Sequence, residues 1–198
     1  MTKEMYYILI SSLIIILMIY IFYVEYLKRN RAKLIDTYIF PSKITDTIKS
    51  TYPHLTDNEI NLVLDGLKEY FYVCNDVGVK MTAMPSKVIG VAWHSFSLLT
   101  NEYGDFCNKA FPDYLYYSPA ECMKSYSFAQ ESLQKTWTFA CLRENIKPNT
   151  PHKIPLLFQL DKDLKISDGF FYSLECNKEG EYCVKNIGFY RSDYAGND

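Results

Sequence analysis

The segment MYYILISSLIIILMIYIFYV, residues 5–24, carries no charged side chain, and its only residues of polar type besides tyrosine are Ser11 and Ser12. At a rise of about 1.5 Å per residue, a helix of this length spans about 30 Å, which is the thickness of the hydrocarbon core of a bilayer. Backbone groups in lipid must be hydrogen-bonded within the segment. The sequence therefore predicts one continuous transmembrane helix that contacts the bilayer through residues 5–24.

Two other interpretations of this segment are a cleaved signal peptide and the core helix of a soluble domain. A signal peptide has a shorter apolar stretch and a small-residue cleavage site, whereas the sequence EYLK follows here at 25–28. A core helix usually has a polar face, which this segment lacks. We therefore predict a retained anchor and juxtamembrane helix over residues 1–34 and a soluble domain over residues 35–198.

The charges on either side of the apolar segment predict its orientation. Before it, Lys3 is offset by Glu4, while four cations follow it, namely Lys28, Arg29, Arg31 and Lys33. Positively charged flanks stay on the cytoplasmic side of a membrane. The prediction is a single-pass protein of the cell inner membrane with the bulk of the chain in the cytoplasm. The other possibility is that the domain lies outside the cell.

The charge of the soluble part argues against a nucleic-acid partner. The whole chain has a net charge of −2, but its first 34 residues are basic, so residues 35–198 are distinctly acidic. An acidic surface repels phosphate backbones, and no basic stripe interrupts it. The whole chain is 16% aromatic, with 18 Tyr and 12 Phe, and this enrichment suits interfaces as well as a core. We expect another protein as its partner and no nucleic acid.

The soluble part is predicted to be a helical bundle with its core at about 53–160. Thr56 and Glu59 form a capping box, and apolar residues then recur at helical spacing as far as Cys74. A second capping box begins at Ser118, with Pro119 at the first helical position. The fold class is therefore mainly α, with helices expected at 25–40, 42–50, 56–75, 85–100, 101–111 and 118–145.

The tail, residues 161–198, differs from the bundle in its pattern. Two β-prone runs, 170–176 and 182–190, lie on either side of a turn-forming sequence at 177–180 and predict a small C-terminal β-hairpin. Cys176 and Cys183 flank that turn and form a possible disulfide if the domain lies outside the cell. In the cytoplasm, all six cysteines of the chain are expected to be reduced.

A series of aromatic, His and Cys residues in the bundle resembles a known bacterial family. The series runs from MPS at 84–86 through AWHSF at 92–96 to TWTFAC at 136–141 and IPLLFQLD at 154–161. Over residues 53–175 it is similar to an uncharacterised bacterial family related to glycine-rich domain-containing proteins, whose pattern contains W-H-x-F and then Y-x-x-F-C. The signature positions are Pro85, Trp93, His94, Phe96, Tyr103, Phe106, Cys107, Phe111, Pro119 and Trp137.

This chain departs from the family pattern in ways that bear on metal binding. A His-His pair of the family is replaced by Tyr116 and Tyr117, and a glycine is replaced by Pro112. There is also no glycine-rich tail. A closed structural zinc site needs four ligands, and only two soft ones, His94 and Cys107, are left here. They are weak metal candidates, so we expect no metal and no cofactor.

His94 and Cys107 also define the rival function, an enzyme. Cys–His catalysis requires an accessible thiolate beside the imidazole, whereas Phe106 and Phe111 predict burial of Cys107. The sequence has no P-loop, no G-x-G-x-x-G and no H-E-x-x-H. The catalytic residues are therefore unknown. We favour a membrane-anchored binding or scaffold domain that is not an enzyme; the alternative is a membrane-tethered metal protein or Cys/His-dependent enzyme.

Overall fold

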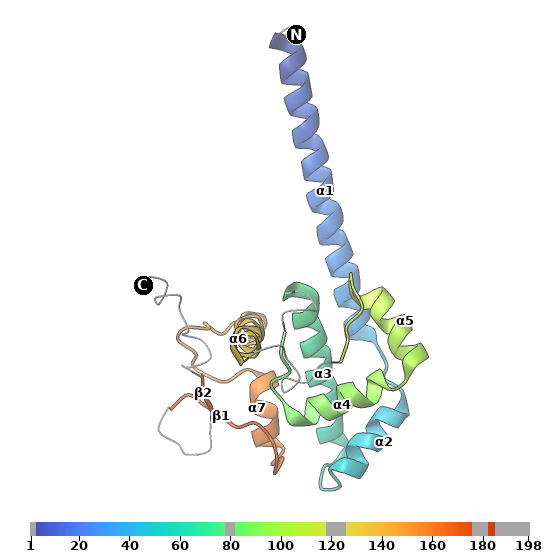
Figure 1. Ribbon diagram of the computed structural model, residues 1–198, viewed down its shortest axis with the longest axis vertical. Coiled ribbons are helices and arrows are strands. Elements are labelled where there is room, and N and C mark those ends of the chain that lie inside the picture. The colour runs from blue at the N-terminus through green and yellow to red at the C-terminus, as the bar shows by residue number, and fades with distance from the viewer. Residues whose placement is uncertain (1–2, 78–81, 118–125, 176–181, 185–198) are drawn as a thin grey trace.

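The computed structural model describes residues 3–77, 82–117, 126–175 and 182–184 of the chain. One long helix projects from a cluster of shorter helices, and a small two-stranded sheet lies at the side of that cluster (Figure 1). The mainly helical fold class is thereby confirmed. In the described residues there are seven helices and one sheet.

Helix α1 (Lys3–Thr37) has two halves that differ in their surroundings. In the outer half, residues 3–24, the apolar side chains that the structure describes are exposed as far as Tyr23, and Val24 is half-buried. None of the most apolar window is buried inside the molecule. In the inner half, residues 25–37, Ile35 is fully buried and the Asp36 carbonyl accepts a hydrogen bond of 2.8 Å from the Lys68 ammonium. The helix thus runs unbroken into the domain core, across the predicted boundary at 34/35.

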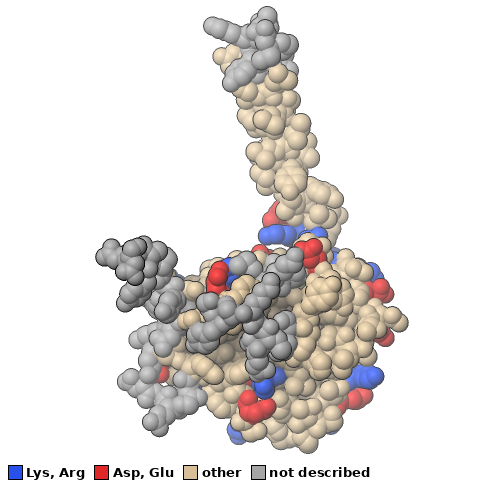
Figure 2. All heavy atoms as spheres, viewed as in Figure 1, with Lys and Arg blue, Asp and Glu red and all other residues tan. Residues whose placement is uncertain are grey.

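Charged side chains collect where α1 enters the domain. Below its grey tip, the projecting part shows no blue or red atoms in Figure 2, and such atoms appear at its base. In the sequence, Glu25 is the first charged residue after the apolar segment, and it pairs with Arg29 at 3.3 Å across one turn. A helical segment without charged side chains, residues 5–24, followed directly by charged residues is the pattern expected of a helix that leaves a bilayer.

Helices α2 (Ser42–Thr51) and α3 (Asp57–Val77) follow α1. The capping box before α3 forms as predicted: the Thr56 backbone N–H donates to Glu59 Oε2 at 2.8 Å, and the Glu59 N–H donates to Thr56 Oγ1 at 3.3 Å. The two side-chain oxygens thus accept hydrogen bonds from backbone N–H groups at the start of the helix. Helix α3 contacts α1, α4, α6 and α7, and is the central element of the domain.

Helices α4 (Lys87–Ser97) and α5 (Thr100–Ala110) complete the aromatic core next to α3. Phe71, Phe96 and Phe106 pack against one another with ring centroids 5.0 to 6.4 Å apart. Gly66 lets α4 approach α3 closely, because a side-chain carbon there would lie 2.8 Å from Ile89 Cδ1. These residues fix α4 against the centre of the domain.

Helices α6 (Tyr126–Arg143) and α7 (Leu156–Asp163) cover the other side of α3. The predicted long helix from 118 is present over its described part, while its capping box at Ser118 and Pro119 lies outside the described residues. The Arg143 guanidinium joins α6 to α3 through two hydrogen bonds to Glu69, of 2.6 and 2.9 Å. The apolar run at 156–160 is part of α7.

The two strands, β1 (Tyr172–Ser173) and β2 (Tyr182–Cys183), confirm a two-stranded sheet but not a hairpin. They pair in parallel, with Tyr172 opposite Tyr182, whereas a hairpin is antiparallel. The physical reason is that tertiary contacts position β1: the Tyr172 ring packs on Phe158 at 4.9 Å, and its hydroxyl donates to the Pro85 carbonyl at 3.1 Å. The turn-forming sequence at 177–180 predicted antiparallel pairing, and this direction was wrong.

Asp161 on α7 joins three elements through its buried carboxylate. Its oxygens accept hydrogen bonds from the Ser86 hydroxyl at 2.6 Å, from the backbone N–H groups of Lys87 and Val88 at 2.7 and 3.1 Å, and from Phe170 N–H at 2.9 Å. A carboxylate at a helix N-terminus satisfies free backbone donors and is favoured by the helix dipole. The interaction fixes the N-terminal end of α4.

Candidate functional site

An open cleft lies between α2 and α4, with a volume of about 370 Å³. This volume is near the lower limit for small-ligand sites, which is about 300 Å³. Its lining comes from both helices and from the segment after α5: Lys43, Thr47, Thr51, Val91, His94, Ser95, Leu98 and Tyr117. We call it the α2–α4 cleft.

Helix α2 contributes one face to the cleft, because residues spaced by four positions lie on the same side of a helix. Lys43, Thr47 and Thr51 are spaced by four and line the cleft. Ile44 and Ile48 lie on the adjacent face and are fully buried. The apolar face holds α2 on the core and leaves a polar face toward the opening.

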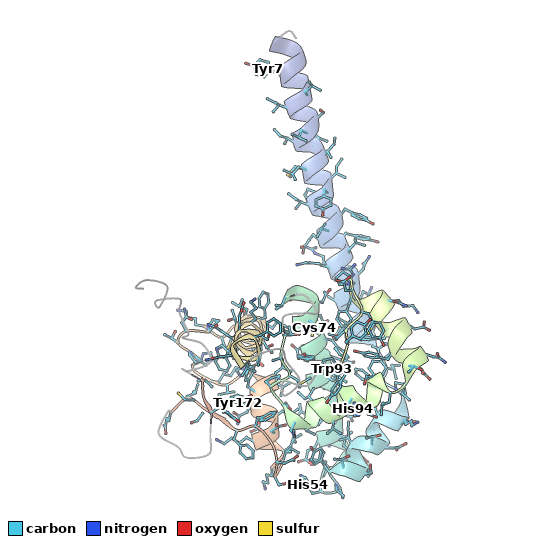
Figure 3. All side chains as sticks on the ribbon, viewed as in Figure 1. Tyr7, His54, Cys74, Trp93, His94 and Tyr172 are labelled. Atoms are coloured by element: carbon cyan, nitrogen blue, oxygen red, sulfur yellow. The ribbon has the colours of Figure 1, made fainter. Side chains whose placement is uncertain are left out.

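Helix α4 separates core residues from cleft residues in the same way. Trp93 and Phe96 are buried, whereas His94 is exposed and Leu98, just after the helix, is 65% exposed. Figure 3 shows Trp93 and His94 as neighbours on α4, with Cys74 on the adjacent α3. The His94 ring lies against Tyr117, with centroids 4.7 Å apart, so an aromatic side chain borders the cleft at this point.

A chain of hydroxyl groups joins the two walls of the cleft. The Ser95 hydroxyl donates to Thr47 Oγ1 at 3.0 Å, and the Thr47 hydroxyl donates to the Lys43 carbonyl at 2.9 Å. The Thr51 hydroxyl donates to the Thr47 carbonyl at 2.8 Å. The bond from Ser95 joins α4 to α2, and the two threonine bonds lie within α2. All three hydroxyl protons are therefore already used within the protein.

Two polar groups in the cleft have no such partner. In the part of the chain that the structure describes, neither the Lys43 ammonium nor the His94 ring nitrogens form a hydrogen bond or ion pair. Among the described residues that line the cleft there is no Asp or Glu, although the domain as a whole is acidic. The cleft therefore offers hydrogen-bond donors and a positive charge to a ligand.

Cys107, the other predicted site residue, lies in the core and not in the cleft. It is fully buried on α5, where burial raises the pKa of its thiol above the ordinary value. Cys74 on α3 is also fully buried, and burial raises its pKa to about 12. Thiols with raised pKa values are poor nucleophiles at neutral pH. Within the described residues, no hydrogen bond joins Cys107 to His94.

The surroundings of Cys107 are a buried polar network. Trp93 Nε1 donates to the Tyr103 hydroxyl at 2.8 Å, and that hydroxyl donates to the Leu115 carbonyl at 2.5 Å. Burial raises the pKa of Tyr103 well above its usual range. Such a network satisfies polar groups inside the core and has a structural role.

The signature residues belong mostly to the core. His94 is exposed, whereas the buried ones are Pro85, Trp93, Phe96, Tyr103, Phe106, Cys107, Phe111 and Trp137. Pro119 lies outside the described residues. His94 is the signature residue that the structure places in the open cleft. Tyr117, which stands where the expected pattern has a His, lies beside it.

The structure also bears on the weak metal candidates and on the possible disulfide. Among the described residues there is no group of three or more His, Cys, Asp or Glu side chains that could hold a metal ion. His94 and Cys107 are not part of such a group. Cys183 is disulfide-bonded. Its predicted partner, Cys176, lies outside the described residues.

Sequence reasoning missed most of the cleft. Lys43, Thr47 and Thr51 carry a signal, their spacing of four beside the buried Ile44 and Ile48, but that pattern is common to amphipathic helices. The segment containing Leu98 lies across α2 only because of tertiary packing. Asp161 ends the sequence IPLLFQLD at 154–161, but no pattern in the neighbouring sequence indicates that its carboxylate contacts the start of α4.

Comparison with known proteins gives a family and no further relative. No curated protein and no solved structure matches the chain. The model of an uncharacterised family, described as UCP032817-like, matches residues 30–190. An uncharacterised family was expected, but nothing in the comparisons supports the resemblance to glycine-rich domain-containing proteins. The match begins in the inner half of α1 and covers most of the folded domain, so this chain belongs to the UCP032817-like family.

Proposed function

We propose that this chain is a single-pass membrane protein whose folded domain is a binding module. The outer half of α1 supports the anchor: it is apolar, with a mean hydropathy of 2.1 over its most apolar window, and buries nothing inside the molecule. Leaving these side chains in water would be strongly unfavourable, because each Å² of exposed apolar surface costs about 25 cal/mol of free energy. A bilayer provides the apolar surroundings that the domain does not.

The inner half of α1 determines how the module is held. Because α1 is continuous to Thr37 and Ile35 is buried in the core, the domain is attached to its anchor by a helix and not by a flexible linker. The domain then keeps a nearly fixed orientation to the bilayer. This arrangement suits a module that presents one surface in a defined direction.

The α2–α4 cleft is the binding site in this proposal. It is open and of small-ligand size, and within the described residues the Lys43 ammonium and the His94 ring nitrogens in its lining form no hydrogen bond or ion pair. Cys74 and Cys107, in contrast, are buried with raised pKa values. The open feature of the domain thus suits binding more than thiol chemistry. A protein partner remains a prediction from composition alone.

The side of the membrane is part of the proposal. The four cations after the span favour the cytoplasm. The disulfide at Cys183 favours an oxidising compartment, where such bonds persist. We propose the cytoplasmic orientation, in the inner membrane, because the cations act during insertion. Protease added to intact spheroplasts should leave the domain uncut; its digestion would place the domain outside.

A cleft-filling variant tests the binding function. Thermal unfolding of the full-length protein in a neutral detergent would be followed with a library of small molecules. Thr51→Trp fills the cleft, and Ser50→Trp adds the same side chain at the exposed neighbouring position, which does not line it. Compounds that stabilise the wild type and Ser50→Trp, but not Thr51→Trp, support the proposal. The absence of any such compound contradicts it.

A further inference from the structure

We propose that the α2–α4 cleft binds a small organic carboxylate whose charged group is joined to a compact apolar group. This inference rests on the proposed function, since it names the ligand class of the same cleft. It is derived from the charge, the hydrogen bonding and the apolar lining of the cleft.

The position of Lys43 indicates an anionic ligand. Lys43 lies in the first turn of α2, where the helix dipole favours a negative charge, and that turn contains no acidic residue. A cation at this position does not stabilise the helix. Its ammonium is also without a partner in the described part of the chain, and it faces a cleft without carboxylates.

His94 provides a second donor in the same cleft. Its ring contacts Tyr117 but forms no hydrogen bond within the described residues, so a ring N–H can donate to a ligand. One ammonium and one imidazole suit the two oxygens of a carboxylate.

The rest of the lining requires an apolar part in the ligand. Val91, Leu98 and the Tyr117 ring present hydrocarbon surface, and the hydroxyls of Thr47, Thr51 and Ser95 are already used as donors within the protein. A small inorganic anion would leave this surface in contact with water. A carboxylate attached to a ring or a branched chain would cover it.

The location of the cleft separates it from the bilayer. Helix α2 lies at the pole of the domain away from the projecting part of α1 (Figure 1). Lipid headgroups at the anchor are therefore at the other end of the domain. A water-soluble ligand is the kind that this position can receive.

The probe for this inference is 4-fluorophenylacetate, and its binding to the full-length protein in neutral detergent is followed by fluorine NMR. We expect saturable binding, with Lys43→Gln weakening it about tenfold, the loss typical of one charge-assisted hydrogen bond. The matched variant Lys49→Gln removes a cation from the same helix outside the cleft, where it pairs with Asp57, and should leave the affinity unchanged. Neither variant should lower the melting temperature by more than a few degrees.

Other probes decide between this inference and the broader proposal. If 4-fluorophenylacetamide binds as tightly as the acid, or Lys43→Gln has no effect, carboxylate recognition is wrong. If that amide still binds the wild type and not Thr51→Trp, the cleft remains a binding site and only its ligand class is wrong. Tighter binding of inorganic phosphate than of the fluorinated acid would overturn the choice of a carboxylate. If neither fluorinated compound binds at about 10 mM, the inference fails as well.

Discussion

The two halves of α1 have similar helical backbones and opposite surroundings. Leu13 in the outer half is 66% exposed and Ile16 is 63% exposed, whereas Ile35 in the inner half is fully buried. Apolar side chains inside a domain stabilise its fold, while apolar side chains that contact nothing need another apolar phase. We propose a separate role for each half, anchoring for the outer half and core packing for the inner half, and substitutions can test the two roles separately.

The largest expected effect is on membrane attachment. Replacing Ile15 and Ile19 together by Asp places two charges near the centre of the outer half, at a cost of about 6 kcal/mol for insertion. The variant should leave the membrane fraction, while its domain melts at the same temperature as the wild type. Ile39→Asp, at a position 89% exposed beyond the helix, should stay in the membrane fraction. Equal membrane attachment of the double variant and the wild type would contradict the role of the outer half.

The next largest effect concerns the domain, which should fold independently of the outer half. Asp161→Ala leaves four buried or partly buried donors without their acceptor and should lower the free energy of unfolding by about 3 to 5 kcal/mol. Chemical denaturation measures this loss, and membrane attachment should not change. Asp163→Ala is the control on the same helix, since Asp163 is exposed and accepts one side-chain hydrogen bond from Gln159. Similar losses in both variants would show that the buried carboxylate has no special role.

Ile35→Ala tests the inner half directly. Removing a fully buried side chain should lower the free energy of unfolding by about 3 kcal/mol through lost burial and a residual cavity. The exposed Ile39→Ala should change it by less than about 0.5 kcal/mol. Denaturation of the full-length protein in detergent gives both values. An unchanged stability in Ile35→Ala would mean that the inner half is not part of the core.

The smallest effect is a pH dependence that arises from the core beside the inner half. Burial raises the pKa of Cys74 from its ordinary value of 9.0 to about 12. The folded state therefore keeps this proton at pH values where the unfolded state loses it. Its contribution to stability is complete below pH 9 and declines as the pH rises toward 12, by up to about 1.4 kcal/mol per pH unit.

Denaturation at pH 8 and pH 10 would measure this decline. Cys74→Ala should reduce the loss between the two pH values by about 1 kcal/mol relative to the wild type. The other buried thiols and tyrosines still contribute in both proteins, so the comparison isolates Cys74. Identical pH profiles would contradict the raised pKa.

The sequence predicted those parts of the fold that depend on local signals. The uncharged run at 5–24 predicted a helix, and the capping box of Thr56 and Glu59 predicted the start of α3 within one residue. The parallel pairing of β1 and β2 was not predictable in this way. It depends on Tyr172 reaching Phe158 and Pro85, contacts between residues distant in the sequence.

The candidate site was predictable only in part. His94 was identified, but Cys107 was grouped with it because both are signature positions of the family resemblance and possible metal ligands. They separate in the structure because Trp93 and Phe96 set the inward face of α4, which leaves His94 outside, while Cys107 lies on the inward face of α5. Lys43 comes from a helix that precedes the whole series, and only the packing of α2 on α4 brings it to His94.

The central claim is that the outer half of α1 stays attached to the domain and lies in a bilayer. Membranes from cells that produce the protein would be washed with alkaline carbonate, and the intact mass of the retained chain measured. The account predicts a chain of full length, 23.2 kDa, in the washed membrane pellet. A shorter chain that begins after residue 24, recovered in the aqueous fraction without detergent, would contradict it.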